Sequence, residues 1–306
     1  MLNIFGLPIL IAFVLGYFFP YVALSLSPYA FIVLFMMMTA SALDIKWSII
    51  KQIRSNKFEM ALGLFFLFLF FPLIQWFLAK TMIAEESLFY GTMLASLCPV
   101  AIVAPGFTKM HNGDEDLSFL LMIASMILFP LAVLFALSIT HQTMHMKPII
   151  IDMMILIFFP LALGEIIKRI DQKFFAQTII KGWKNWAAEF NMFAIAFLAF
   201  IYLGASVSKL NLSYTPWKEL LAVLFIIMFQ DFGVYFLCRF ITRRIFAEDK
   251  AQALTISISM KNLAVSGAIL LIYDPKASLA SAMGFFVHAL FFNFLVMTRP
   301  NVKPKK

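Results

Sequence analysis

Long apolar runs recur along almost the whole chain and constrain its fold more than any other feature. A helix of about 20 predominantly apolar residues is long enough to cross a bilayer. Reading between charged or turn-rich breaks gives ten such runs, at approximately 4–21, 28–43, 58–79, 87–110, 116–139, 149–168, 187–207, 217–240, 250–273 and 277–298. The sequence therefore predicts an all-α polytopic membrane protein that forms a single domain over residues 1–306, with the lipid bilayer as its solvent.

The composition excludes a soluble protein. Charged residues make up 13% of the chain, against about 25% in soluble domains. The net charge of +8 would suggest nucleic acid as a partner for a soluble protein, but these basic residues lie in short loops, so no nucleic-acid partner is expected. Cys98 and Cys238 both lie in apolar runs, which argues against a disulfide framework or a zinc site. The sequence does not indicate an oligomeric state.

The basic residues in the loops predict the topology. The loops between successive runs lie on alternate sides of the membrane. Of the 24 Lys and Arg, 18 lie on one side and 5 on the other, and Lys261 alone lies within a run. The five are Lys80, Lys147, Lys209, Lys218 and Lys276. Because loops rich in Lys and Arg stay in the cytoplasm, the bias predicts an integral protein of the cytoplasmic or plasma membrane with both termini in the cytoplasm.

The run 87–110 carries two prolines near its middle, Pro99 and Pro105. Proline has no backbone N–H, and its ring clashes with the preceding helical turn, so the two together predict an interrupted helix. The alternative is that they only kink a packed helix, because proline is commoner in membrane helices than in soluble ones. Unwound backbone at this depth requires cover from protein or from a water-filled cavity.

The run 250–273 contains no proline, but polar residues gather at its centre. Lys261 lies there together with Ser257, Ser259 and Asn262. A lysine at the bilayer centre costs about 2.5–3.5 kcal/mol on insertion scales, so its default interpretation is functional. The polar cluster predicts a second interrupted helix.

The two interrupted runs occupy matched places. Ten runs divide into halves of five, about 1–140 and 149–298, and an odd number of spans sends the second half into the membrane from the opposite side. The fourth run of each half is the interrupted one. Paired interruptions of this kind mark the binding site of transporters built from inverted repeats.

Three stretches resemble the bile acid:sodium symporter family. "CPVAIVAPGFTKMHNGDEDLS" (98–118) is similar to the first crossing helix of that family and the turn after it, "ISISMKN" (256–262) to the second crossing helix, and "FFPLALG" (158–164) to the sixth span. The resemblance implies a panel domain and a core domain, the core having crossing helices that bracket the substrate and ion sites. It also implies transport of organic anions such as bile acids, pantoate or pyruvate, usually with sodium.

Most of the sodium ligands that the resemblance implies are missing here. The family positions fall on Leu67, Ala104, Pro105, Ser118, Met122, Ser257 and Lys261. Of these, Ser118 is kept, together with backbone carbonyls near Ile258 and Met260, and the shared glutamate falls on Ser257. The region expected to bind substrate or ion comprises Pro99, Ala104, Pro105, Ser118, Ser257, Ser259, Met260, Lys261 and Asn262.

The missing sodium ligands suggest a role for Lys261. Its ammonium could replace the charge of sodium at the crossing, the place where the two interrupted helices are expected to meet. A buried ammonium needs a partner, and Asp231, the only acid deep within an apolar run, is the obvious candidate. Such a pair could change protonation during transport or could be a static salt bridge. A third alternative is direct contact between Lys261 and an anionic substrate. His288, also at mid-depth, is a candidate proton relay, although a helix-to-helix hydrogen bond is the commoner role.

The function predicted from the sequence is secondary transport of an organic anion by alternating access, sodium-independent or proton-linked. One alternative is a conventional sodium symporter with rearranged ligands, and another is a non-transporting sensor or scaffold on the same fold. No enzyme motif is present, and no cofactor or resident metal is expected. Whether sodium binds is left open.

Overall fold

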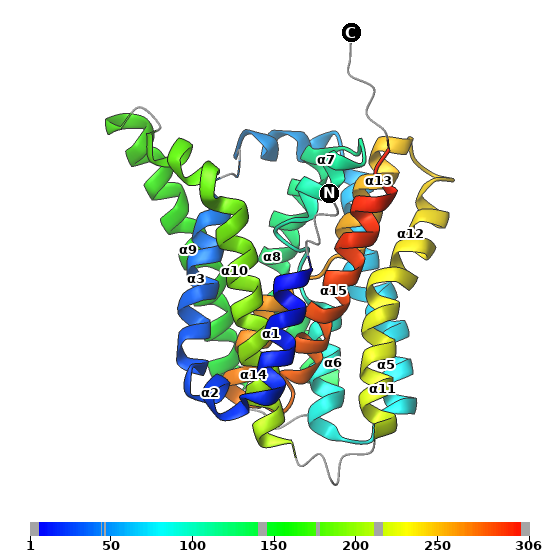
Figure 1. The fold of residues 1–306 in the computed structure, drawn as a ribbon. Coiled ribbons are helices and arrows are strands. Elements are labelled where there is room, and N and C mark those ends of the chain that lie inside the picture. Colours follow the sequence, from blue (N-terminus) through cyan, green and yellow to red (C-terminus); the bar gives the residue numbers. More distant parts are fainter. Residues whose placement is uncertain are drawn as a thin grey trace.

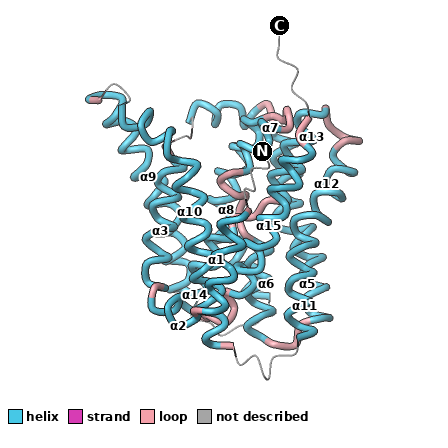
Figure 2. The backbone as a smooth tube through the Cα atoms, viewed as in Figure 1, coloured by secondary structure: helices cyan, strands magenta, loops and turns pink. Residues whose placement is uncertain are grey.

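The computed structural model describes residues 6–43, 45, 47–139, 146–175, 178–210 and 217–300, and the regular elements within these ranges are all helical (Figures 1 and 2). The α-helices are α1 (Leu7–Phe18), α2 (Pro20–Ser25), α3 (Ser27–Ala42), α4 (Lys57–Phe65), α5 (Phe71–Met82), α6 (Glu86–Leu97), α7 (Ala104–Met110), α8 (Glu115–Ile139), α9 (Met146–Phe174), α10 (Thr178–Lys209), α11 (Trp217–Met228), α12 (Val234–Thr242), α13 (Glu248–Ser259), α14 (Leu263–Tyr273) and α15 (Leu279–Thr298). A 3₁₀-helix, η1 (Trp47–Arg54), and two π-helices, η2 (Phe66–Phe70) and η3 (Phe229–Gly233), complete the set.

These elements confirm the all-α prediction, and each predicted apolar run coincides with one or more helices. Five helical stretches of the described chain are long and apolar enough to cross a membrane: Lys57–Met82, Glu115–Phe135, Glu189–Lys209, Trp217–Thr242 and Leu279–Thr298. The predicted boundaries of three segments are wrong. The expected link between the first two runs contains α2, which follows α1 after a break at Phe19, and α9 and α10 extend beyond their apolar runs into polar sequence.

The helices pack in two groups. In the first, α1, α2, α3 and α9 contact α10, and in the second, α4 to α8 pack with α11 to α15. Figure 1 shows α3, α9 and α10 on one side of the molecule and α5, α11 and α12 on the other. The groups meet where α15 contacts α1 and α10, and where α14 contacts α3 and α9. The interrupted helices α6–α7 and α13–α14 both belong to the second group.

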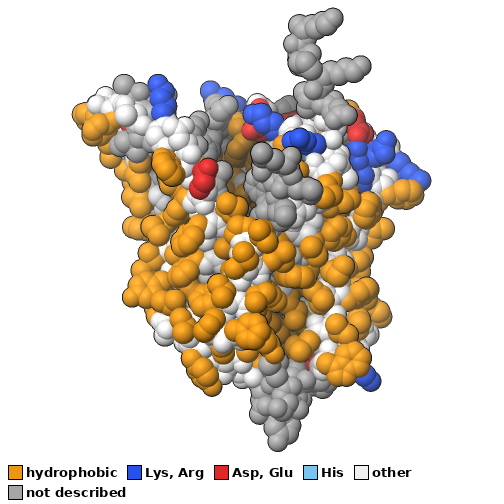
Figure 3. Space-filling model, in the orientation of Figure 1, with side chains coloured by type: hydrophobic (Ala, Val, Ile, Leu, Met, Phe, Trp, Pro, Cys, Tyr) orange, Lys and Arg blue, Asp and Glu red, His pale blue; other side chains and the backbone are white. Residues whose placement is uncertain are grey.

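The surface has the layout of a membrane protein. Large hydrophobic side chains are exposed around the middle of the molecule, and Figure 3 shows them as a broad band on the visible face. Most of the Lys and Arg visible on that face gather at one end of the molecule, at the top of the view, where α7 lies and α13 begins. An apolar band with basic residues at one end fits a bilayer. Residues 1–5 and 301–306, on which the predicted position of the termini depends, lie outside the described ranges.

Gly91 on α6 is expected to be essential for packing. A Cβ at this position would lie 2.1 Å from the carbonyl oxygen of Ala277, a backbone atom that cannot move aside alone. We expect Gly91→Ala to destabilise the fold by about 1–3 kcal/mol, the usual cost of overpacking. The matched control is Gly182→Ala on α10, where an added Cβ meets nothing within 4 Å. Thermal unfolding in detergent measures both variants, and equal melting temperatures would contradict the prediction.

Candidate functional site

Two interrupted helices meet at their breaks. α6 ends at Leu97 and α7 begins at Ala104, while α13 ends at Ser259 and α14 begins at Leu263. Between them, two short extended segments run antiparallel, with Val100 opposite Lys261. The prediction that both helices are interrupted is therefore confirmed.

Backbone hydrogen bonds across the crossing satisfy groups that the breaks release. The amide of Ala101 donates to the carbonyl of Met260 at 2.8 Å, and the amide of Asn262 donates to the carbonyl of Pro99, also at 2.8 Å. The amide of Val100 donates to the side-chain oxygen of Ser125 at 3.0 Å. An unpaired backbone group costs several kcal/mol in an apolar environment, so each break depends on the other.

The two breaks have different local causes. Pro99 lies inside the first break, and Pro105 lies in the first turn of α7, a position where proline is tolerated because its missing N–H would be unpaired anyway. The second break contains no proline. Its extended conformation at Met260 (φ −92°, ψ 104°) is held by the pairing with the first break.

Lys261 is buried at the crossing and reaches across to another helix. Its side chain is 2% exposed, and Nζ donates to the carbonyl oxygen of Leu67 at 3.0 Å. That carbonyl is available because of the π-helix η2, in which each amide donates to the carbonyl five residues earlier. The amide of Phe71 donates to the carbonyl of Phe66, but the donor for Leu67 would be residue 72, a proline without an N–H. The ammonium of Lys261 therefore supplies the partner that Pro72 cannot provide.

The predicted pair between Lys261 and Asp231 is not formed. Asp231 lies on η3, and its carboxylate faces His288 on α15, with 3.7 Å between Oδ2 and Nδ1. Lys261 instead extends toward η2, which lies within the span Lys57–Met82. Among the residues that the structure describes, no acidic side chain lies within 4.0 Å of the lysine nitrogen.

Ser118 and Ser257, two of the expected site residues, are in direct contact. Their hydroxyl oxygens lie 2.7 Å apart, and Thr108 donates to Ser118 at 3.3 Å. All three side chains are fully buried. Thr108 was not predicted from the sequence. It lies on α7, one helical turn after Pro105, and this position next to the predicted break is the signal that could have identified it. The cluster offers hydroxyl oxygens to a cation but no carboxylate, and the hydroxyls already satisfy one another.

The remaining predicted residues of the second crossing helix make one contact within that helix and one with α3. Ser259 donates back to the carbonyl of Thr255 at 2.9 Å, and the side-chain amide of Asn262 lies 3.9 Å from the sulfur of Met38. The part of the chain that the structure describes holds no cluster of three His, Cys, Asp or Glu side chains suited to a metal ion.

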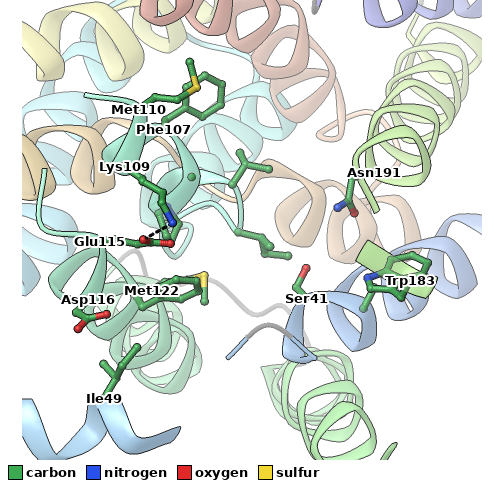
Figure 4. Close-up of a pocket in the computed structure, with 16 residues that line it drawn as sticks. Ser41, Ile49, Phe107, Lys109, Met110, Glu115, Asp116, Met122, Trp183 and Asn191 are labelled. Atoms are coloured by element: carbon green, nitrogen blue, oxygen red, sulfur yellow. Dashed lines mark ion pairs between the residues drawn. The ribbon is translucent and has the colours of Figure 1, made fainter. Parts of the chain in front are cut away.

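A cavity of about 560 Å³ opens beside the first crossing helix (Figure 4). It lies between the two groups of helices, because α3 and α10 form one wall while the segment 102–110, α8 and η1 form the other. Figure 4 shows Trp183 and Asn191 across the cavity from Lys109 and Met122. Of the predicted site residues, Pro105 lines this cavity, whereas Lys261 does not.

The cavity combines an apolar lining with a few charged groups. Its larger apolar side chains are Phe107, Met110, Phe119, Met122 and Trp183. Lys109 and Glu115 form an ion pair of 3.0 Å at its edge, and the lysine side chain stays largely exposed. Asp116 also lines the cavity, so its charged groups are one lysine and two carboxylates. Such a mostly apolar lining suits an amphipathic molecule.

Comparison with known proteins agrees with this geometry. The sequence model of the sodium bile acid symporter family matches residues 31–212, more than half of the chain, from α3 to the end of α10. No curated protein is similar enough to count as a match. The matched range includes the first interrupted helix and every side of the cavity, and its extent shows that this chain belongs to the sodium bile acid symporter family.

Proposed function

We propose that this chain is a secondary transporter that carries an organic anion across the membrane by alternating access, without sodium. Membership of the symporter family supports transport as the general activity. The observation that carries the finer proposal is the ammonium of Lys261, buried at the crossing and bonded to the carbonyl of Leu67. Both residues stand at positions where the resemblance implies sodium ligands, so a tethered cation takes the role of the metal ion.

The geometry supports an inverted repeat of five spans in each half, about 1–140 and 149–298. The fourth span of each half is interrupted, and the third span of each half, Lys57–Met82 and Trp217–Thr242, contains a π-helix near its middle. Two structural irregularities at matched places are hard to obtain by chance. In transporters of this kind, one group of helices rocks against the other around a fixed site.

The cavity supports the choice of substrate. It lies between the two groups of helices, the place where rocking would open and close a path, and it is lined mostly by apolar side chains beside Lys109. The apolar part of an amphipathic molecule fits this lining, and the choice of an organic anion as the substrate rests on the resemblance to the symporter family. The cavity lies at the end of the molecule where basic residues gather, which we assign to the cytoplasmic side, with both termini.

Exchange measurements in liposomes test the proposal. The purified protein is reconstituted with unlabelled anion inside, and entry of labelled anion is followed for a bile acid and for several small carboxylates, in sodium or potassium salt of equal ionic strength. We expect at least one anion to exchange equally fast in both salts. Exchange that requires sodium would indicate a conventional symporter with displaced ligands, and absence of exchange with every anion would indicate a non-transporting protein.

A further inference from the structure

Asp231 and His288 face each other in the core, apart from the crossing lysine. Asp231 on η3 is fully buried and His288 on α15 is 3% exposed. The carboxylate oxygen Oδ2 and the ring nitrogen Nδ1 are 3.7 Å apart. Neither residue lines the cavity or contacts Lys261.

The hydrogen bonds of this pair are incomplete. Both carboxylate oxygens of Asp231 and Nε2 of His288 are buried without a hydrogen-bond partner. His288 Nδ1 lies 2.9 Å from the carbonyl oxygen of Gly284, and since a carbonyl only accepts, Nδ1 carries a hydrogen. Nε2 is then the open acceptor of the ring. A bare carboxylate in such a place is costly, and one proton, held by the carboxyl group or by Nε2, removes that cost.

No other charge compensates Asp231. The π-helix η3 packs against α11, α12, α13 and α15. Apart from His288, the ionisable groups described on these helices are Lys218, Glu219, Tyr235, Cys238, Arg239, Glu248, Asp249 and Lys250. None of them makes an ion pair or a hydrogen bond with Asp231, and four have partners elsewhere: Arg239 binds Glu248, Lys250 binds Glu59, and Glu219 accepts from the amide of Glu85.

A short chain of contacts links this pair to the crossing. Gln230, the neighbour of Asp231, accepts a hydrogen bond from the side chain of Gln75 on the span that carries η2. Its amide nitrogen lies 3.5 Å from the carbonyl oxygen of Ile258 and 3.4 Å from that of Ser259, at the end of α13. A change in charge at Asp231 therefore acts next to the backbone that positions Lys261.

We propose that Asp231 and His288 form a proton-binding site, and that a proton taken up there from one side of the membrane is released on the other with each anion transported. This proposal rests on the transport function proposed above and names its coupling ion. The proton binds to the carboxyl group or to Nε2 and leaves from the same atom, so the cycle consumes nothing but the proton gradient. The buried unpaired atoms and the absence of a nearby compensating charge carry the inference.

Transport driven by a pH gradient tests the coupling. Liposomes with an alkaline interior are expected to accumulate anion through the native protein, and Asp231→Asn is expected to lower this accumulation at least tenfold while gradient-free exchange continues. His288→Gln is expected to shift the pH dependence of accumulation. Asp249→Asn, an identical change at an exposed acid of α13, serves as the control and is expected to behave like the native protein. Native-like accumulation by Asp231→Asn would overturn the proton site and leave the transport function standing.

A second measurement does not depend on transport. Infrared difference spectra between two pH values show the C=O band of a protonated carboxylic acid. We expect this band in the native protein and in Asp249→Asn, and its loss in Asp231→Asn. If the native protein shows neither this band nor a pH-dependent imidazole band that His288→Gln removes, or if Asp231→Asn and His288→Gln both keep the native spectrum, the proton site is wrong even where anion exchange is observed.

Discussion

Replacing Lys261 with methionine is expected to lower anion exchange at least tenfold, in sodium and in potassium alike. Methionine fills similar space but removes both the charge at the crossing and the side-chain donor to the Leu67 carbonyl. A buried carbonyl left without a donor costs about 1–3 kcal/mol, so the melting temperature should fall as well. Labelled-anion exchange in liposomes and thermal unfolding in detergent measure the two effects.

Replacing Lys261 with alanine separates charge from packing. Alanine leaves a space beside the Leu67 carbonyl, and sodium is a hard cation that prefers carbonyl and hydroxyl oxygens. We expect Lys261→Ala to gain a thermal stabilisation by sodium over potassium, since a ligand that binds the folded state stabilises it by mass action. The native protein should show no such difference between the two salts.

A lysine at the surface provides the control for both variants. Lys250 pairs with Glu59 at 2.7 Å in a partly exposed position, where an ion pair contributes little to stability. Lys250→Met is expected to exchange anion at the native rate. If Lys261→Met also exchanged at the native rate, the ammonium would be a packing element and the tethered-cation proposal would fail.

Some of this site was predictable from the sequence because local chemistry decides it. Proline has the same effect on a helix wherever it occurs, so Pro99 and Pro105 predicted the first interruption. Apolar length predicted the helices, since backbone groups inside a bilayer must be paired within a helix. Lys261 could be singled out on its own, because a lysine at the centre of a membrane span is rare and marks a functional position before its neighbours are known.

The partners of these residues were not predictable, since they depend on which helices face each other. Lys261 binds Leu67 because Pro72 and a π-helical register release that carbonyl, and a π-helix has no clear sequence signal. Pro72 alone indicates that a carbonyl about one turn earlier lacks its backbone donor, but it does not indicate which residue donates to that carbonyl instead. Asp231 was assigned to the wrong partner for the same reason: its helix turns it toward His288.

The boundaries of α9 and α10 show a different limit. Their apolar runs end where the bilayer should end, yet both helices continue through polar residues. Hydropathy therefore measures the membrane-embedded part of a helix and not the helix itself. The cavity was invisible to the sequence analysis because its walls come from α3, α7, α8 and α10, which are brought together only by the fold.

Filling the cavity at Gly106 is expected to block transport without unfolding the protein. Gly106 lines the cavity on α7, and a Cβ added to it would meet no atom within 4 Å. Gly106→Trp therefore places a large aromatic ring into a space of about 560 Å³ without displacing existing atoms at its base. We expect anion exchange to fall at least tenfold and the melting temperature to stay within a few degrees of the native value, as exchange and thermal unfolding can measure.

Two further variants make the cause of this loss clear. Gly106→Ala adds only a methyl group and should keep native exchange, which excludes a requirement for glycine itself. Gly182→Trp puts the same ring at another open glycine on α10, one that does not itself line the cavity, and should also keep native exchange. If Gly106→Trp were stable and still exchanged anion at the native rate, the substrate would have to pass elsewhere. The anion path would then lie outside the space between the two helix groups, and rocking of one group against the other would no longer explain transport.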